Sequence, residues 1–198
     1  MISNHPTLVV EISDNRFIFA VVEESNGNYK YSHKLISTNE GFRDNKIDDL
    51  DLACDSLKDS IYLIEQKIGH TFKDVIVIVD NYKCSIYNFA GFKKLNGSQL
   101  AKENITYILN SLKSQINEIE NQKTVLHIFN SKYLLDKKKT ENLPIGLFGN
   151  FYSQELSFLL IENNYYKNLN NLFNKCNLRV KKIISKSFIK GVNLINDY

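Results

Sequence analysis

The sequence predicts a mixed α/β fold with a compact strand–helix–strand–strand unit in its middle. Three patterns indicate this fold: short strands open the chain, two long helices separate later strands, and a strand–helix–strand–strand order occupies the middle.

The chain is expected to begin with three antiparallel strands. Residues 8–12 and 17–22 are apolar runs, whereas 29–37 alternate and present one more polar face. The polar residues 13–15 lie between the first two strands, and Asn26-Gly27 lies between the next two. Asp, Asn and Gly favour tight turns at such positions, because they bond nearby backbone groups or adopt positive φ.

A helix and a buried strand follow. Apolar residues recur at three- and four-residue steps from Leu50 to Ile68. Asp48 or Asp49 can cap the start of this helix, and Gly69 is placed to end it. Residues 74–79 form a solid apolar run, as in a strand that is buried on both faces. We expect this strand to run parallel to the first.

The middle of the chain predicts a mixed strand and a second helix. The strand covers 82–92 and is broken at 96–98, where Asn96 or Ser98 can cap the helix. We expect the apolar stripe of this helix to be a core face, with a coiled-coil partner surface as the alternative. The stripe consists of Ile105, Ile108, Leu109, Leu112, Ile116 and Ile119.

Two further strands complete the strand–helix–strand–strand unit. Residues 124–135 are apolar on both faces at their start, so we expect a strand inside a sheet. Residues 137–142 contain three lysines and are expected to form a solvated loop, with contact to an acidic partner as the alternative. Pro and Gly residues at 144–149 then set a bend before a strand at 151–161. A third helix is expected from 163–164 to Asn177.

Composition and spacing argue against several classes of protein. The formal net charge of +3, with interleaved acids and bases, gives no basic field for nucleic acid. Cys54, Cys84 and Cys176 lack CxxC spacing, so we expect reduced, mostly buried thiols in a cytosolic protein. The four histidines are too scattered to predict a metal site. No signal-peptide pattern or membrane-spanning apolar run of about 20 residues is visible.

The central stretch resembles the insertion subdomain of the FtsA family of actin-like bacterial cell-division proteins. V-L-H-I-F-N-S-K-Y-L-L-D followed by L-P-I-G-L-F-G is similar to the strand and loop of that family, and the order of elements agrees from about Leu8 onward. The resemblance implies a partial actin-like, ribonuclease-H-like lobe over 1–81 and 163–198, with the SHS2 insertion over 82–162. The family continues well beyond this chain.

The resemblance also implies the structure of the C-terminal stretch. It makes 179–185 a strand of the parent sheet and 188–196 a helix packed on that sheet. Taken alone, residues 180–195 have apolar side chains on one helical face and lysines elsewhere. The alternative is therefore a basic amphipathic helix that lies on an anionic membrane.

The resemblance places the first phosphate-binding turn of the family directly after the first strand. The family pattern Asp-Ile-Gly-Thr/Ser corresponds here to Glu11, Ile12, Ser13 and Asp14, followed by Asn15 and Arg16. Ser13 carries a Cβ where glycine allows close approach, and Asp14 repels phosphate. We expect an ordinary hairpin turn, a degenerate form of the family's phosphate turn, with a working phosphate clamp as the alternative. The candidate nucleotide-contacting residues are Glu11, Ser13, Asp14, Asn15 and Arg16.

By the same resemblance, the other half of the nucleotide cleft would lie beyond Tyr198. We therefore expect no cofactor in this chain alone, and ATP with magnesium only where a longer chain completes the cleft. No catalytic residue and no metal ligand is predicted. An ATP-hydrolysing enzyme of the actin superfamily is the alternative function.

The function that the resemblance implies is scaffolding at the cytoplasmic face of the membrane during cell division. Family members self-associate head to tail, bind the tubulin-like protein FtsZ and contact later division proteins. The candidate interface is a loop formed by Asn142, Leu143, Pro144, Ile145 and Gly146. The alternatives are a pilus-assembly relative and a membrane-surface adaptor that acts through residues 180–195.

Overall fold

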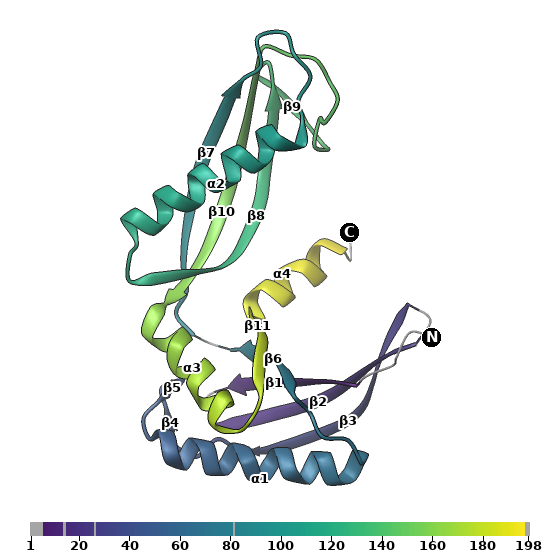
Figure 1. The fold of residues 1–198 in the computed structure, drawn as a ribbon, viewed down its shortest axis with the longest axis vertical. Helices are drawn as coiled ribbons and strands as arrows, with labels where there is room; N and C mark the ends of the chain where they lie inside the picture. Colours follow the sequence, from purple (N-terminus) through teal and green to yellow (C-terminus); the bar gives the residue numbers. More distant parts are fainter. Residues whose placement is uncertain (1–5, 14, 26, 81, 197–198) are drawn as a thin grey trace. The chain divides into compact units, whose positions relative to one another are not determined.

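The computed structural model of the chain describes residues 6–13, 15–25, 27–80 and 82–196 (Figure 1). The chain divides into two compact units. Unit 1 comprises Met1–Lys83 and Asn164–Tyr198, and unit 2 comprises Cys84–Asn163. The chain thus passes from unit 1 into unit 2 once and returns once.

Unit 1 is built on a five-stranded sheet of order β11-β6-β1-β2-β3. Its strands are β1 (Thr7–Ser13), β2 (Arg16–Ser25), β3 (Asn28–Thr38), β6 (Asp74–Val79) and β11 (Arg179–Ser185). β1, β2 and β3 pair antiparallel, as predicted. β6 runs parallel to β1, which confirms that prediction, and β11 runs parallel to β6.

The core of unit 1 follows from the alternation of side chains along these strands. Leu8, Val10 and Ile12 of β1 are buried, as are Val75, Val77 and Val79 of β6. Because the Cβ atoms of a strand alternate between faces, these residues line one face at a two-residue period. The intervening side chains of both strands are partly buried, in keeping with the central position of the strands.

Helix α1 (Leu50–Ile68) has the caps that the sequence predicts. The side chain of Asp49 accepts hydrogen bonds from the backbone N–H groups of Asp51 and Leu52, both at 3.0 Å. Gly69 ends the helix in the left-handed conformation, at φ 69°. A two-residue hairpin, β4 (Phe42–Arg43) with β5 (Lys46–Ile47), precedes the helix.

Helix α3 (Asn163–Lys175) packs its apolar face inward and ends before Asn177, which has a positive φ of 59°. Cys176 is buried beside Cys54 of α1, and their Sγ atoms lie 3.5 Å apart as free thiols. Burial raises the pKa of the Cys176 thiol to about 12. Two of the three cysteines are thus buried and reduced, as predicted, while Cys84 is half-buried.

The C-terminal stretch forms a strand and a helix. Residues 179–185 form the predicted strand of the parent sheet, β11, which pairs in parallel with β6, so the alternative of one continuous amphipathic helix over 180–195 is wrong. Helix α4 (Lys186–Asn196) begins earlier than predicted, and its described side chains are half-buried or exposed. The packing of this helix on the sheet stays a prediction.

Unit 2 is a four-stranded antiparallel sheet of order β7-β10-β8-β9, with α2 on one face (Figure 1). The elements are β7 (Ser85–Lys94), α2 (Lys102–Ile119), β8 (Lys123–Leu135), β9 (Lys138–Thr140) and β10 (Phe151–Glu162). Its first and last strands are paired, with Ser85 opposite Leu160. The strand–helix–strand–strand order is therefore present, with β9 added.

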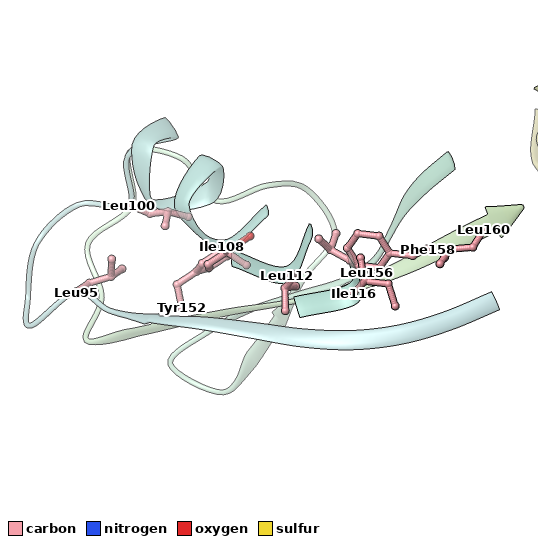
Figure 2. Close-up of a cluster of buried hydrophobic side chains, with 9 residues drawn as sticks. All are labelled: Leu95, Leu100, Ile108, Leu112, Ile116, Tyr152, Leu156, Phe158 and Leu160. Atoms are coloured by element: carbon pink, nitrogen blue, oxygen red, sulfur yellow. The ribbon is translucent and has the colours of Figure 1, made fainter. Parts of the chain in front are cut away.

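The core of unit 2 lies between α2 and the sheet (Figure 2). It consists of Leu95, Leu100, Ile108, Leu112, Ile116, Tyr152, Leu156, Phe158 and Leu160. The predicted stripe of α2 is therefore a core face along most of its length. Ile119, at the end of the helix, is the exception because it is 62% exposed.

Two local predictions for unit 2 are corrected, and one is confirmed. Residues 137–142 are not one loop, because Asp136 and Lys137 adopt positive φ in a tight turn that pairs β9 with β8. The prediction that 124–135 lies inside a sheet is confirmed, because β8 lies between β10 and β9. The strand predicted over 82–92 begins at Ser85. Tyr82 instead stacks on Tyr165 in unit 1, with ring centroids 3.7 Å apart.

The predicted cap of α2 is also wrong. Asn96 and Gly97 take positive φ in a turn, and the helix begins only at Lys102. Its N-cap residue is Ala101, whose backbone N–H donates to Asn104 Oδ1 at 2.8 Å. The hydrogen bond between the Leu100 N–H and the Leu147 carbonyl delays the start, because it holds the preceding residues to another segment.

The close approach of α2 to β7 requires glycine at position 91. A Cβ at Gly91 would lie 2.3 Å from Ile108 Cγ2, inside the packed core. We expect Gly91→Ala to lower the free energy of unfolding by roughly 1–3 kcal/mol, measured by denaturant titration. Gly191→Ala, which meets no atom within 4 Å, is the control and should cause no loss. Equal stability of Gly91→Ala and the parent would contradict this packing.

Candidate functional site

The carboxyl ends of β1, β6 and β11 lie side by side in the sheet of unit 1, because these three strands run parallel. In open α/β sheets, ligand sites form outside this edge. The predicted phosphate turn follows β1 and therefore lies here. Of the candidate residues, Glu11, Ser13, Asn15 and Arg16 are described, whereas Asp14 lies outside the described residues.

Three charged side chains meet at this edge, one from each parallel strand or its end. Lys186 Nζ lies 2.7 Å from Glu11 Oε1 and 2.6 Å from Asp80 Oδ2. Glu11 belongs to β1, Asp80 directly follows β6, and Lys186 directly follows β11. We call these residues the strand-end cluster.

The strand-end cluster is partly shielded from water. The side chains of Lys186, Glu11 and Asp80 are 29%, 19% and 14% exposed. One ammonium faces two carboxylates, so the cluster carries a formal charge of −1. Hydrogen bonds to Asp80 and then to Glu11 raise the pKa of Lys186 above its ordinary value. The cluster thus keeps its cation in the charged form at neutral pH.

The turn after β1 is held by its own hydrogen bonds. Ser13 Oγ donates to the Arg16 carbonyl at 3.3 Å, and Asn39 Nδ2 donates to the Ser13 carbonyl at 2.6 Å. Ser13 and Asn39 are buried, whereas Asn15 and Arg16 are exposed. The structure therefore brings Glu11 and Ser13 to one edge of the sheet but does not place Arg16 in the strand-end cluster.

These residues do not fit a magnesium nucleotide of the kind that an actin-like fold implies. Lys186 occupies the space between the two carboxylates that would face a divalent cation. Ser13 has a side chain where the family has glycine, and both its hydroxyl and its carbonyl are bonded within the turn and to Asn39. In the described part of the chain, no group of three or more His, Cys, Asp or Glu side chains is arranged for a metal ion.

Sequence reasoning identified Glu11 but missed Asp80 and Lys186. The sequence does contain a signal for both residues, because Asp80 directly follows β6 and Lys186 directly follows β11. The pairing of these residues depends on three strands that are far apart in the sequence: Lys186 is 106 positions from Asp80 and 175 from Glu11. Local patterns therefore indicated each position but not the contact.

The second predicted site, the loop 142–146, lies in unit 2. Pro144 is buried and Leu143 packs partly against the core cluster. The Gly146 N–H donates to the Leu100 carbonyl at 2.9 Å, which ties the loop to the segment before α2. Asn142 and Ile145 are exposed. Leu143 and Pro144 thus anchor the loop in unit 2, while Asn142 and Ile145 are exposed to solvent.

The exposed surface continues beyond the predicted residues. Ile145, Leu147 and Phe148 are 42%, 54% and 69% exposed, and they form an apolar tip that the sequence prediction covered only in part. Gly146 adopts a φ of +84° between them. Neighbouring exposed apolar side chains of this kind are typical of protein contact surfaces rather than of small-molecule sites. Among the described residues, no helix is long and apolar enough to cross a membrane.

Comparison with known proteins supports the resemblance. No family model matches the chain. The chain is 25% identical over 187 residues to the cell division protein FtsA of Buchnera aphidicola subsp. Schizaphis graminum. This alignment covers 93% of the chain and 44% of that protein. The chain therefore spans less than half the length of this relative, and the predicted resemblance to FtsA is confirmed.

One solved structure shows the same architecture. A chain of a PilM–PilN type IV pilus biogenesis complex aligns with a TM-score of 0.58 and 8% identity, covering 92% of this chain and 48% of that chain. A Bacteroides thetaiotaomicron protein described as having an actin-like ATPase fold aligns with a TM-score of only 0.32. The predicted fold class, a partial actin-like α/β lobe, is confirmed.

We expect Lys186→Met to destabilise the protein, because it leaves two partly buried carboxylates facing each other. The expected loss in the free energy of unfolding at neutral pH is roughly 1–3 kcal/mol, measured by denaturant titration. Lys190→Met is the matched control: it removes a lysine from the exposed side of the same helix and should change stability by less than about 0.5 kcal/mol. Equal effects of the two substitutions would contradict a structural role for the strand-end cluster.

The pH dependence of this loss has a defined sign. The folded pKa of Lys186 is raised, so its contribution is complete below the unfolded pKa and is lost as the pH rises through the folded pKa. The stability difference between parent and Lys186→Met should be constant from about pH 6 to about pH 9 and should shrink at higher pH. A difference that grows above that range would contradict this assignment.

Proposed function

We propose that the chain forms part of a cell-division scaffold of the FtsA type, which self-associates and links FtsZ and later division proteins at the inner face of the membrane. The observation that carries this proposal is sequence similarity to a cell division protein over 93% of the chain. The likeness to the pilus complex shows the fold alone, at 8% identity. A division role is therefore better supported than a pilus role.

The two sites fit a scaffold better than an enzyme. The strand-end cluster neutralises its own carboxylates with a lysine, so it offers little to a substrate. The loop of unit 2 presents Ile145, Leu147 and Phe148 to solvent on an anchored backbone. Large apolar side chains that are held in place and exposed are suited to burial against another protein. We assign the loop 142–146, extended to Phe148, as a contact surface for a neighbouring subunit or a division partner.

The loop assignment is tested by placing a charge at its tip. Gly146→Asp should weaken self-association and keep the fold, because a Cβ at this position meets no atom within 4 Å and Asp is among the residues that best tolerate the strain of a φ of +84°. Gly146→Asn is the matched control, since it has the same size and the same tolerance of positive φ without the charge. Sedimentation velocity compares the three proteins. Sedimentation of Gly146→Asp that equals that of parent and Gly146→Asn would contradict the assignment.

We further propose that the 198-residue chain by itself does not hold ATP. Lys186 competes with magnesium for the two carboxylates, and the turn at Ser13 uses its polar groups internally. Titration with a fluorescent ATP analogue and magnesium should therefore show no saturable binding. An otherwise identical titration of Lys186→Gln tests whether the lysine is the obstacle. Saturable, competable binding to the parent chain would contradict this proposal and favour the nucleotide-binding alternative.

A further inference from the structure

β7 is an edge strand of unit 2 that lacks the usual protection of sheet edges. In the described part of the chain it pairs with β10 and with no other strand. The ten-residue pairing has no register shift, whereas the pairing of β8 with β10 contains two. Residues 85–92 include no charged side chain and no proline. Proteins normally interrupt such edges with bulges, prolines or charges, because a regular open edge pairs with other strands.

The outward face of β7 carries two large apolar side chains. Ile86 and Phe92 are 65% and 62% exposed on the sheet face opposite α2. Phe92 stacks on Phe151 of β10, with ring centroids 5.5 Å apart, so its position is fixed. On the other face, Tyr87 and Phe89 pack against the core cluster. A strand added at this edge would therefore meet ordered apolar side chains on both faces.

We propose that β7 pairs with β7 of a second copy of this chain, antiparallel and centred on Phe89. In that register Ile86 lies opposite Phe92, Tyr87 opposite Gly91, and Asn88 opposite Ala90. A two-fold axis repeats each pair, so two Ile–Phe contacts form on the exposed face. When β7 is aligned antiparallel with a second β7, its two large exposed apolar side chains therefore lie opposite each other.

Charge favours the same arrangement. The lysines of β7 stand only at its end, at positions 93 and 94. In the proposed register Lys93 lies opposite Ser85 of the other strand. Each positive end therefore meets the neutral start of the other strand, and the two lysine pairs lie at opposite ends of the interface. A parallel pairing would instead place the lysines together.

The product would be one continuous antiparallel sheet made from two four-stranded sheets. The two-fold axis stands perpendicular to that sheet, so both α2 helices lie on the same face. This contact goes beyond the proposed function, because head-to-tail association through the loop needs no two-fold contact. Loss of the β7 contact would leave loop-mediated association in place, so the two can fail separately.

Sedimentation equilibrium of the full chain tests the contact. We expect reversible dimers that Phe92→Lys weakens roughly tenfold or more, because each dimer contains two Ile86–Phe92 pairs. Leu194→Lys is the matched control, since Leu194 is an equally exposed apolar residue of α4, at 63%. It should leave the dimer unchanged. A monomer at all concentrations, or equal effects of the two variants, would overturn the proposal.

A cross-linking experiment tests the register without relying on dimer strength. In a Cys84→Ser background, Asn88→Cys protein and Ala90→Cys protein are mixed and oxidised with copper phenanthroline. Directly opposite residues in an antiparallel pair have Cβ atoms about 5 Å apart, close enough for a disulfide. We expect the heterodimer to form faster than in a mixture of Asn88→Cys with Lys139→Cys on β9. Equal rates in the two mixtures would overturn the register and leave β7 to a strand of another protein.

Discussion

The parallel pairing of β1 with β6 is the constraint on which unit 1 depends. Parallel neighbours cannot be joined by a tight turn, so the chain must cross over between them. β2, β3 and α1 lie in that crossover, and the caps of α1 at Asp49 and Gly69 define where it turns back. β11 then adds to the far side of β6 in the same direction. The alignment of three carboxyl ends at one edge is a direct result.

The charged residues at that edge compensate one another. Carboxylates at the ends of parallel strands require a compensating charge, because burial disfavours their ionised form. Lys186 supplies this charge from within the chain. The cluster therefore stabilises the edge of the sheet instead of leaving it open. The exposed apolar groups of unit 2, at Ile145 and Phe148 and along β7, provide surfaces suited to protein partners.

Most of the fold was predictable because its signals are local. The apolar runs of β1 and β6, the stripe of α1 and its caps all fall within a few residues of one another. The errors arose where a distant contact decided the outcome. Helix α2 starts late because the Leu100 N–H donates to the Leu147 carbonyl. The strand-end cluster could be inferred only in part, because its three members meet through sheet order alone.

Unit 2 begins and ends on two strands that are bonded to each other, with Ser85 opposite Leu160. Its two connections to the remaining chain therefore emerge at neighbouring positions. A segment closed in this manner can be removed, lengthened or replaced by a short turn without rerouting the polypeptide around it. The surfaces of unit 2 can therefore change in sequence and length while the strand order of the sheet in unit 1 stays the same.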